Sequence, residues 1–229
     1  MALTNVLLLS QIAGYVIGLI LSICMIVPMS MHQNEFSGHC LLFSRGLWQE
    51  EDGQLLVSWA SPIYCHYIII LGVFSFIACS VQIYRLSMFM FKGQDSSFLS
   101  AFMEAMLCAV YGGWTLGGAL FVTFGFITWC QKITERFPSC EAAAGQDIDQ
   151  KDKIHTNGFY MQMGTVQFAT WAMFANWVGV GVFSMLKVCR YHQLENIQVS
   201  MYRERQRLLN ENESPTHGRS TPPMDTLNE

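Results

Sequence analysis

Charged residues are scarce in this chain. Asp, Glu, Lys and Arg make up 13% of its 229 residues, against about 25% in an average soluble protein. The formal net charge is only -4, so the charge balance gives no reason to expect nucleic acid as a partner. The scarcity is greatest between residues 105 and 129, which carry no charge. A helix needs about 20 apolar residues to cross the core of a bilayer, and this run is longer than that.

The usual motifs of catalysis and metal binding are also missing. His39 lies beside Cys40 and His66 beside Cys65, but neither pair forms a CxxC or HExxH arrangement, so a metal site is not expected. An enzyme within the membrane would need a nucleophile with a base or a metal. The thiols in the apolar runs suit helix packing better; they are Cys24, Cys79 and Cys108. We therefore expect no enzymatic activity and no cofactor.

Long apolar runs dominate what is present. Four of them predict an all-α membrane protein, a four-helix transmembrane bundle within residues 1–189. The expected spans are about 5–29, 65–88, 102–129 and 166–188, and the larger connections are the loops 30–64 and 130–165. The first loop holds two strand-like segments around the acidic turn 49–53, which predicts a small β-hairpin.

Glycines are spaced about one helical turn apart in two of the spans. Small residues at this spacing let helices approach each other backbone to backbone. The residues expected at such contacts are Gly14, Gly18, Gly112, Gly113, Gly117 and Gly118.

Polar residues interrupt the spans at a few positions. Arg85 lies near the far end of the second span, and Glu104 at the start of the third is expected to reach water as an interfacial carboxylate. Gln167 and Asn176 in the fourth span are expected to form interhelical hydrogen bonds worth about 1 kcal/mol or less.

The loop cysteines and the positive residues together predict the orientation. Basic residues favour the cytosolic side, and their excess after the fourth span indicates that both termini are cytosolic. The four loop cysteines then face the opposite side, where disulfides persist. Four cysteines allow three pairings, and the pairs that close the shortest loops are preferred: Cys40–Cys65 and Cys130–Cys140.

The segment after the fourth span changes character. Apolar positions at helical spacing predict an amphipathic helix at 190–209 on the membrane surface, followed by a disordered cytosolic tail at 210–229. The juxtamembrane thiol Cys189 is a candidate for palmitoylation. Glu204 with Leu208 and Leu209 resembles an acidic dileucine signal for a clathrin adaptor, although both leucines also suit the end of the amphipathic helix.

Several stretches together resemble the transmembrane protein 179 family. They are Phe36–Phe43 with Trp48, Lys92-Gly93 with Ser97–Phe102, Thr128–Glu135, Ser139–Glu141, Gln146–Asp149, and Phe159-Tyr160 with Gln167–Trp171. The resemblance covers the chain to about Tyr191. It implies a membrane protein of four spans and implies no particular biochemical activity.

A looser resemblance is to claudin-like four-span proteins, through the span number, the cytosolic ends and Gly46-Leu47-Trp48. The claudin pattern places both loop cysteines after Gly-Leu-Trp, whereas Cys40 precedes it here. Paracellular sealing is therefore not the expected role.

These features favour a non-enzymatic scaffold or accessory subunit. It would bind the lipid bilayer and other membrane proteins, in the plasma membrane or in endosomal or secretory-pathway membranes. The alternative is an oligomeric channel or transporter component, although the span interiors offer almost no polar residues to line a path.

Overall fold

The computed structural model of the chain describes residues 2–49, 55–92, 98–146, 154 and 156–213. The chain divides into two compact units, Met1–Lys187 and Val188–Glu229. The predicted turn at 49–53 and the predicted tail at 210–229 lie mostly outside the described residues.

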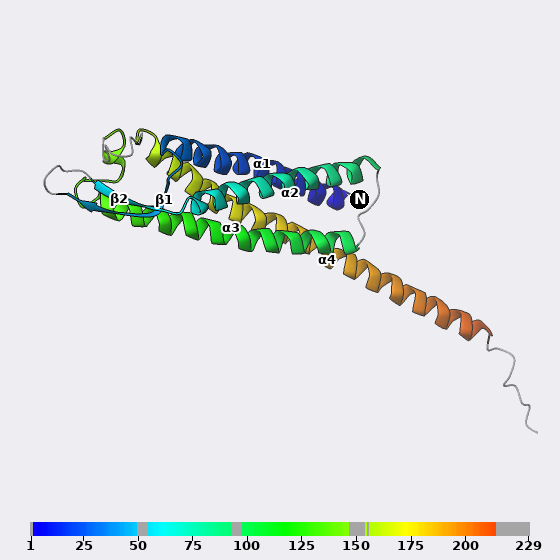
Figure 1. Ribbon diagram of the computed structural model, residues 1–229. Helices are drawn as coiled ribbons and strands as arrows, with labels where there is room; N and C mark the ends of the chain where they lie inside the picture. Colours follow the sequence, from blue (N-terminus) through cyan, green and yellow to red (C-terminus); the bar gives the residue numbers. More distant parts are fainter. Residues whose placement is uncertain (1, 50–54, 93–97, 147–153, 155, 214–229) are drawn as a thin grey trace, which may run out of the picture. The chain divides into compact units, whose positions relative to one another are not determined.

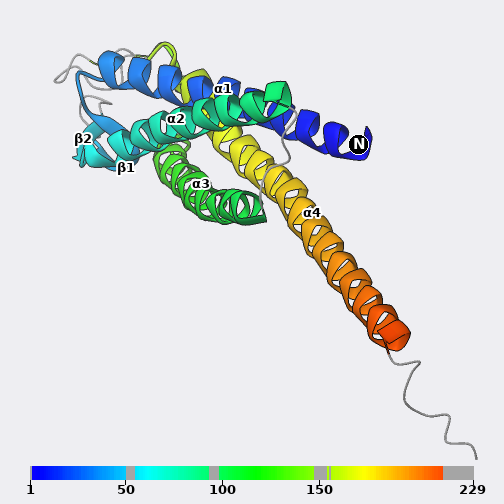
Figure 2. The same ribbon diagram turned by 90° about the vertical axis from the view of Figure 1, so that its right-hand side faces the viewer.

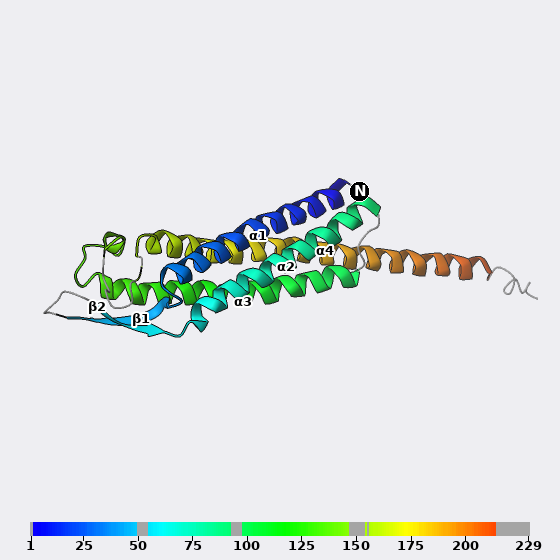
Figure 3. The same cartoon turned by 45° about the horizontal axis from the view of Figure 1, so that its top comes forward.

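Four long helices confirm the predicted bundle. They are α1 (Ala2–Glu35), α2 (Ile63–Lys92), α3 (Phe98–Ile133) and α4 (Phe159–Glu213). Each is long and apolar enough to cross a membrane. In the first unit, one end of the bundle holds the N-terminus, the last turn of α2 and the first turn of α3, and the opposite end holds the β-hairpin (Figures 1 and 3). These are called the N-terminal end and the hairpin end below.

The helices extend beyond the predicted spans. The largest extension is at α4, where one uninterrupted helix covers both the predicted fourth span and the predicted helix 190–209. No Gly or Pro occurs between Lys187 and Asn210, so the sequence contains no helix breaker at the boundary. The helical conformation of 190–209 is therefore present, and its position on a membrane surface stays a prediction.

The predicted β-hairpin is confirmed between α1 and α2. Strands β1 (Cys40–Trp48) and β2 (Leu55–Ala60) pair antiparallel. The register shifts between Cys40 and Arg45, and Phe43 within that stretch has a φ of 63°. A left-handed residue of this kind is unusual for a bulky side chain. Here it accompanies the bulge that turns β1 onto α3.

The hairpin packs closely against the last turns of α3. A Cβ atom added to Gly125 would lie 3.0 Å from the Cβ of Leu42, so the glycine permits the approach. The Phe43 and Phe121 rings meet edge to face with centroids 4.8 Å apart. The Trp48 indole N–H donates to the Lys132 carbonyl at 3.0 Å. Figure 2 shows the strands beside α2 at this end of the bundle.

Both preferred disulfides are formed. Cys40–Cys65 joins the first residue of β1 to the first turn of α2, and Cys130–Cys140 joins the last turn of α3 to the residue before a short 3-10 helix, η1 (Glu141–Ala143). All four loop thiols are therefore consumed, which removes the thiolates that a metal site next to His39 or His66 would have used.

Candidate functional site

Glu104 is buried, which corrects the sequence-based prediction. Its side chain is 1% exposed, whereas an interfacial carboxylate reaching water was expected. The prediction was wrong because it treated α3 alone. Partners from two other helices enclose the carboxylate, and these partners make its burial tolerable.

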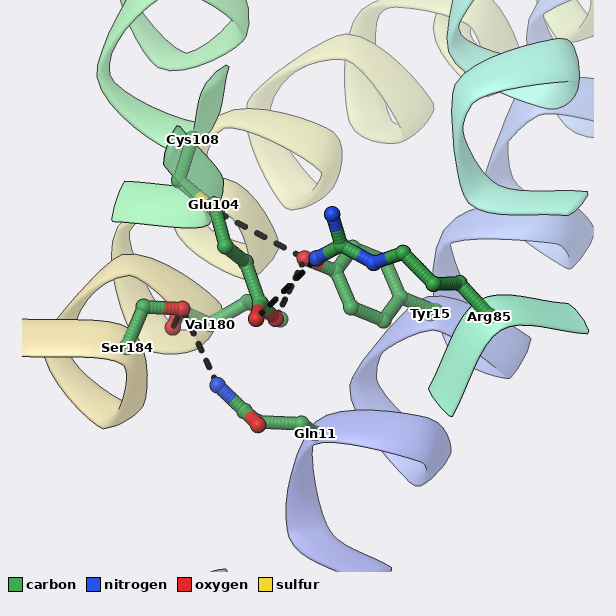
Figure 4. Close-up of polar contacts among 7 residues, drawn as sticks. All are labelled: Gln11, Tyr15, Arg85, Glu104, Cys108, Val180 and Ser184. Carbon is green, nitrogen blue, oxygen red and sulfur yellow. Dashed lines mark hydrogen bonds and ion pairs between the residues drawn. The ribbon is translucent and has the colours of Figure 1, made fainter. Parts of the chain in front are cut away.

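The Glu104 carboxylate accepts contacts from α1 and α2. The Tyr15 hydroxyl donates to Oε1 at 3.1 Å. Arg85 Nη2 forms an ion pair with Oε2 at 3.4 Å. Figure 4 shows both side chains converging on the carboxylate from different helices. The acidic group thus joins three of the four helices at one point.

The fourth helix is joined through a neighbouring amide. Gln11, one turn before Tyr15 on α1, donates from Nε2 to the Ser184 hydroxyl of α4 at 3.0 Å. Ser184 in turn donates to the Val180 carbonyl at 3.0 Å. We call Gln11, Tyr15, Arg85, Glu104 and Ser184 the polar cluster (Figure 4).

The Cys108 thiol lies at the edge of the polar cluster, one turn after Glu104 on α3. Its sulfur is 3.7 Å from the Tyr15 hydroxyl, and the residue is 2% exposed. A substrate could reach this thiol only if the helices separated. The arrangement therefore suits contacts between helices rather than nucleophilic catalysis.

Some buried polar atoms in the polar cluster, and one on the neighbouring Gln82, have no hydrogen-bond partner in the part of the chain that the structure describes. Among the described residues, Gln11 Oε1, Gln82 Oε1 and Arg85 Nε have no hydrogen-bond partner. Gln82 lies one turn before Arg85 on α2 and is 4% exposed. Buried polar groups of this kind cost free energy that an apolar core would not. Ionisable groups inside a membrane mark functional positions more often than structural ones.

A simple signal in the sequence points to the ion pair. Arg85 lies seven residues before the end of α2 at Lys92, and Glu104 lies six residues after the start of α3 at Phe98. In two antiparallel helices joined by a short connection, such residues lie at about the same depth. Opposite charges at equal distances from a turn therefore predict a pair.

The glycines of α1 lie at close contacts with other helices. A Cβ atom on Gly14 would be 2.6 Å from Val180 Cγ2 of α4. On Gly18 it would be 2.7 Å from Cys79 Sγ of α2 and 3.1 Å from Asn176 Nδ2 of α4. Neither position has room for a larger residue.

The four glycines of α3 divide between the inside and the outside of the bundle. A Cβ on Gly118 would lie 2.6 Å from Leu71 Cδ2, and on Gly112 it would lie 3.8 Å from Trp177 Cβ. Gly113 has nothing within 4 Å of that position, and the nearest atom to Gly117 is the Tyr67 hydroxyl at 3.9 Å. Gly113 and Gly117 are both exposed.

The polar residues of the fourth span behave differently from each other. Gln167 Nε2 donates to the Thr123 hydroxyl of α3 at 3.3 Å, which confirms an interhelical hydrogen bond there. Asn176 lies against Gly14 and Gly18, and its Nδ2 has no hydrogen-bond partner among the described residues. The contact of Asn176 with α1 is therefore one of packing.

The proposed modification and sorting residues belong to the second unit. Cys189 is exposed. Glu204 is exposed as well, and Leu208 and Leu209 are 62% and 58% exposed on the same helix. Their accessibility fits the two predictions, and palmitoylation and adaptor binding remain predictions.

The chain matches a known protein family over most of its length. The family model described as "Transmembrane protein 179/179B Claudin domain" matches residues 7–209. No solved structure matches the chain.

Proposed function

Because the chain belongs to the transmembrane protein 179/179B family of claudin-like domains, we propose that this multi-pass membrane protein is a non-enzymatic scaffold or accessory subunit. It binds other membrane proteins side by side within the bilayer. The glycines of α3 carry this proposal, because part of their surface is left open on the outside of the bundle.

The open surface of α3 is formed by three small residues one turn apart. Ala109, Gly113 and Gly117 are all exposed. Between helices in lipid, the attraction comes from close van der Waals packing and not from hydrophobicity, so small residues favour contact. Gly14, Gly18 and Gly118 serve this purpose inside the bundle. We infer that the outer row serves it for a helix of another protein.

The distribution of charge argues for a scaffold over a channel. Arg85 and Glu104, the charged residues of the polar cluster, lie at one end of the bundle and neutralise each other. A conducting path needs polar groups along its whole length. The described charges of the spans do not form such a series.

The disulfides support an orientation with both termini in the cytosol. Cys40–Cys65 and Cys130–Cys140 lie at the hairpin end, and disulfides persist on the non-cytosolic side of cellular membranes. Tags at both termini should be accessible to antibody only after permeabilisation, and a tag inserted near Asp52 should be accessible on intact cells. A C-terminal tag exposed on intact cells would reverse this orientation.

The scaffold role is tested by closing the open row of α3. Gly113→Leu with Gly117→Leu should remove the neighbours recovered by proximity labelling and by co-purification in mild detergent. Gly164→Leu is the matched control, since it adds the same bulk to α4 at an exposed position with nothing within 4 Å. If the double variant recovers the same neighbours as the wild type and the control, this surface is not the binding face. Currents from the purified protein in a planar bilayer would favour the channel instead.

A further inference from the structure

Arg85 is a partly exposed cation beside a buried carboxylate. Its side chain is 32% exposed, while Glu104, its partner, is 1% exposed. On α2, Arg85 borders a row of exposed residues spaced at helical intervals: Val81, Tyr84 and Met88. The guanidinium therefore faces the carboxylate on one side and the lipid-facing surface of α2 on the other.

The depth of Arg85 places its exposed side near lipid headgroups. α2 has 30 residues, which corresponds to about 45 Å of helix, and the hydrocarbon core is about 30 Å thick. A centred helix therefore extends roughly 7 Å beyond the core at each end. Arg85 lies seven residues, or about 10 Å, before the end of α2. Its backbone is thus just inside the core boundary, from which a long side chain reaches the phosphate layer.

The hydrogen bonding of Arg85 leaves capacity for a second acceptor. A guanidinium has five N–H donors. The contact with Glu104 uses Nη2 at 3.4 Å, longer than the about 2.7–2.9 Å of a strong charge-assisted hydrogen bond. Nε is buried and has no hydrogen-bond partner among the described residues, so a second acceptor can be met only by the terminal nitrogens, on the partly exposed side of the side chain. A planar guanidinium with free donors is well suited to a phosphate group.

From these observations we propose that Arg85 binds the phosphate of an anionic phospholipid in the leaflet at the N-terminal end of the bundle. The guanidinium is shared between that phosphate and Glu104. Glu104 holds Arg85 in place and competes with the lipid for it, so the carboxylate sets the affinity.

The site favours an anionic lipid over a zwitterionic one. In phosphatidylcholine the choline cation neutralises the phosphate, whereas phosphatidylserine keeps a net negative charge that a basic side chain near the membrane surface attracts. In the orientation proposed above, this is the cytosolic leaflet, in which such lipids are enriched. The site does not depend on the scaffold role, because it lies on α2 and the open glycine row lies on α3.

The test measures lipid retention by the full-length chain. The protein is reconstituted in phosphatidylcholine nanodiscs that contain a minor fraction of phosphatidylserine, and retained phosphatidylserine is counted by native mass spectrometry. Arg85→Gln should lower its affinity about fivefold, and Glu104→Gln should raise it because the competing carboxylate is neutralised. Arg45→Gln is the charge-matched control, an exposed arginine of β1 at the hairpin end, and should retain the wild-type value.

A loss of folding in Arg85→Gln is separated from a loss of the site by the double variant Arg85→Gln with Glu104→Gln, which leaves no unpaired charge. It should retain as little phosphatidylserine as the single variant. Equal retention by the double variant and the wild type would overturn the proposal, as would an unchanged value for Glu104→Gln. Displacement of the retained lipid by inorganic phosphate or by soluble glycerophosphoserine would also overturn it, since the ligand would then be a free phosphate.

Discussion

The two ends of the bundle are held together by different chemistry. At the hairpin end, two disulfides and a set of packed aromatic rings join the β-hairpin and the loops to the helices. At the N-terminal end, the polar cluster joins the four helices through two hydrogen bonds and one ion pair, Arg85–Glu104. The hairpin end is thus held by covalent bonds, and the N-terminal end by non-covalent contacts that can break and re-form.

The difference indicates which end can change its partners. A disulfide in an oxidising compartment is permanent on the timescale of most binding events. A shared guanidinium can exchange one acceptor for another at little net cost, because each contact replaces another of the same kind. The hairpin end is therefore fixed by covalent bonds, and the N-terminal end is held by contacts that can be exchanged.

The largest expected effect is at the hairpin end. Replacing Cys40 and Cys65 by Ser should lower the free energy of unfolding by about 3.5 kcal/mol, because the disulfide closes a segment of 25 residues. Removing Cys130–Cys140, with a separation of 10, should cost less, about 2.7 kcal/mol. Chemical denaturation in mild detergent measures both values, and wild type treated with reductant is the control. Equal losses for the two pairs would contradict the loop-length argument.

Breaking the ion pair should have the next largest effect. Arg85→Gln leaves Glu104 as an uncompensated buried charge and should cost about 3 kcal/mol, the low end of the usual range, because Arg85 is partly exposed. Adding Glu104→Gln to the same chain should restore most of this loss. A double-mutant cycle, with the free energy of unfolding measured in detergent, gives the coupling energy between Arg85 and Glu104. Strictly additive losses would show that the two side chains do not interact.

The glycines allow a different comparison, between a position packed inside the bundle and a position on its outer surface. Gly18→Leu should destabilise the bundle by about 2 kcal/mol, since Cys79 and Asn176 occupy the space. Gly113→Leu should change stability by less than about 0.5 kcal/mol, since nothing lies within 4 Å. Thermal melting in the same detergent compares the two. A large loss in Gly113→Leu would mean that this face packs inside the protein.

The smallest effect on stability is expected in the second unit. Changing Leu208 and Leu209 to Ala should leave membrane insertion and total abundance unchanged, because both side chains are exposed. If the motif with Glu204 binds an adaptor, the surface fraction measured by biotinylation should rise and the endosomal fraction should fall. If the wild type and the double variant show the same surface biotinylation, the two leucines are part of the helix and have no role in sorting.

Patterns local to one stretch of chain predicted most of the fold. Apolar runs gave the four helices, and the position of Cys65 relative to Cys40 favoured the correct pairing. The continuity of α4 was missed because the change in polarity at Arg190 was read as a boundary, although no residue there breaks a helix.

The polar cluster was missed for a different physical reason. The burial of Glu104 depends on Tyr15 and Arg85, which lie on other helices. Hydrophobic periodicity reports which face of a helix is apolar, and it does not identify the residue that meets a polar group from a neighbour. Only the matched positions of Arg85 and Glu104 about the connection between α2 and α3 carried that information.

The hydrogen bond between Gln11 and Ser184 has a consequence for biosynthesis. The two residues are 173 positions apart, and a chain is made from its N-terminus. Tyr15, Arg85 and Glu104 can meet once α3 is in the membrane, but Gln11 remains without Ser184 until nearly all of the fourth span has been made. A chain that stops short of Ser184 presents a bare amide within the bilayer. The hydrogen bond between Gln11 and Ser184 thus distinguishes a bundle that contains most of its fourth span from one that does not.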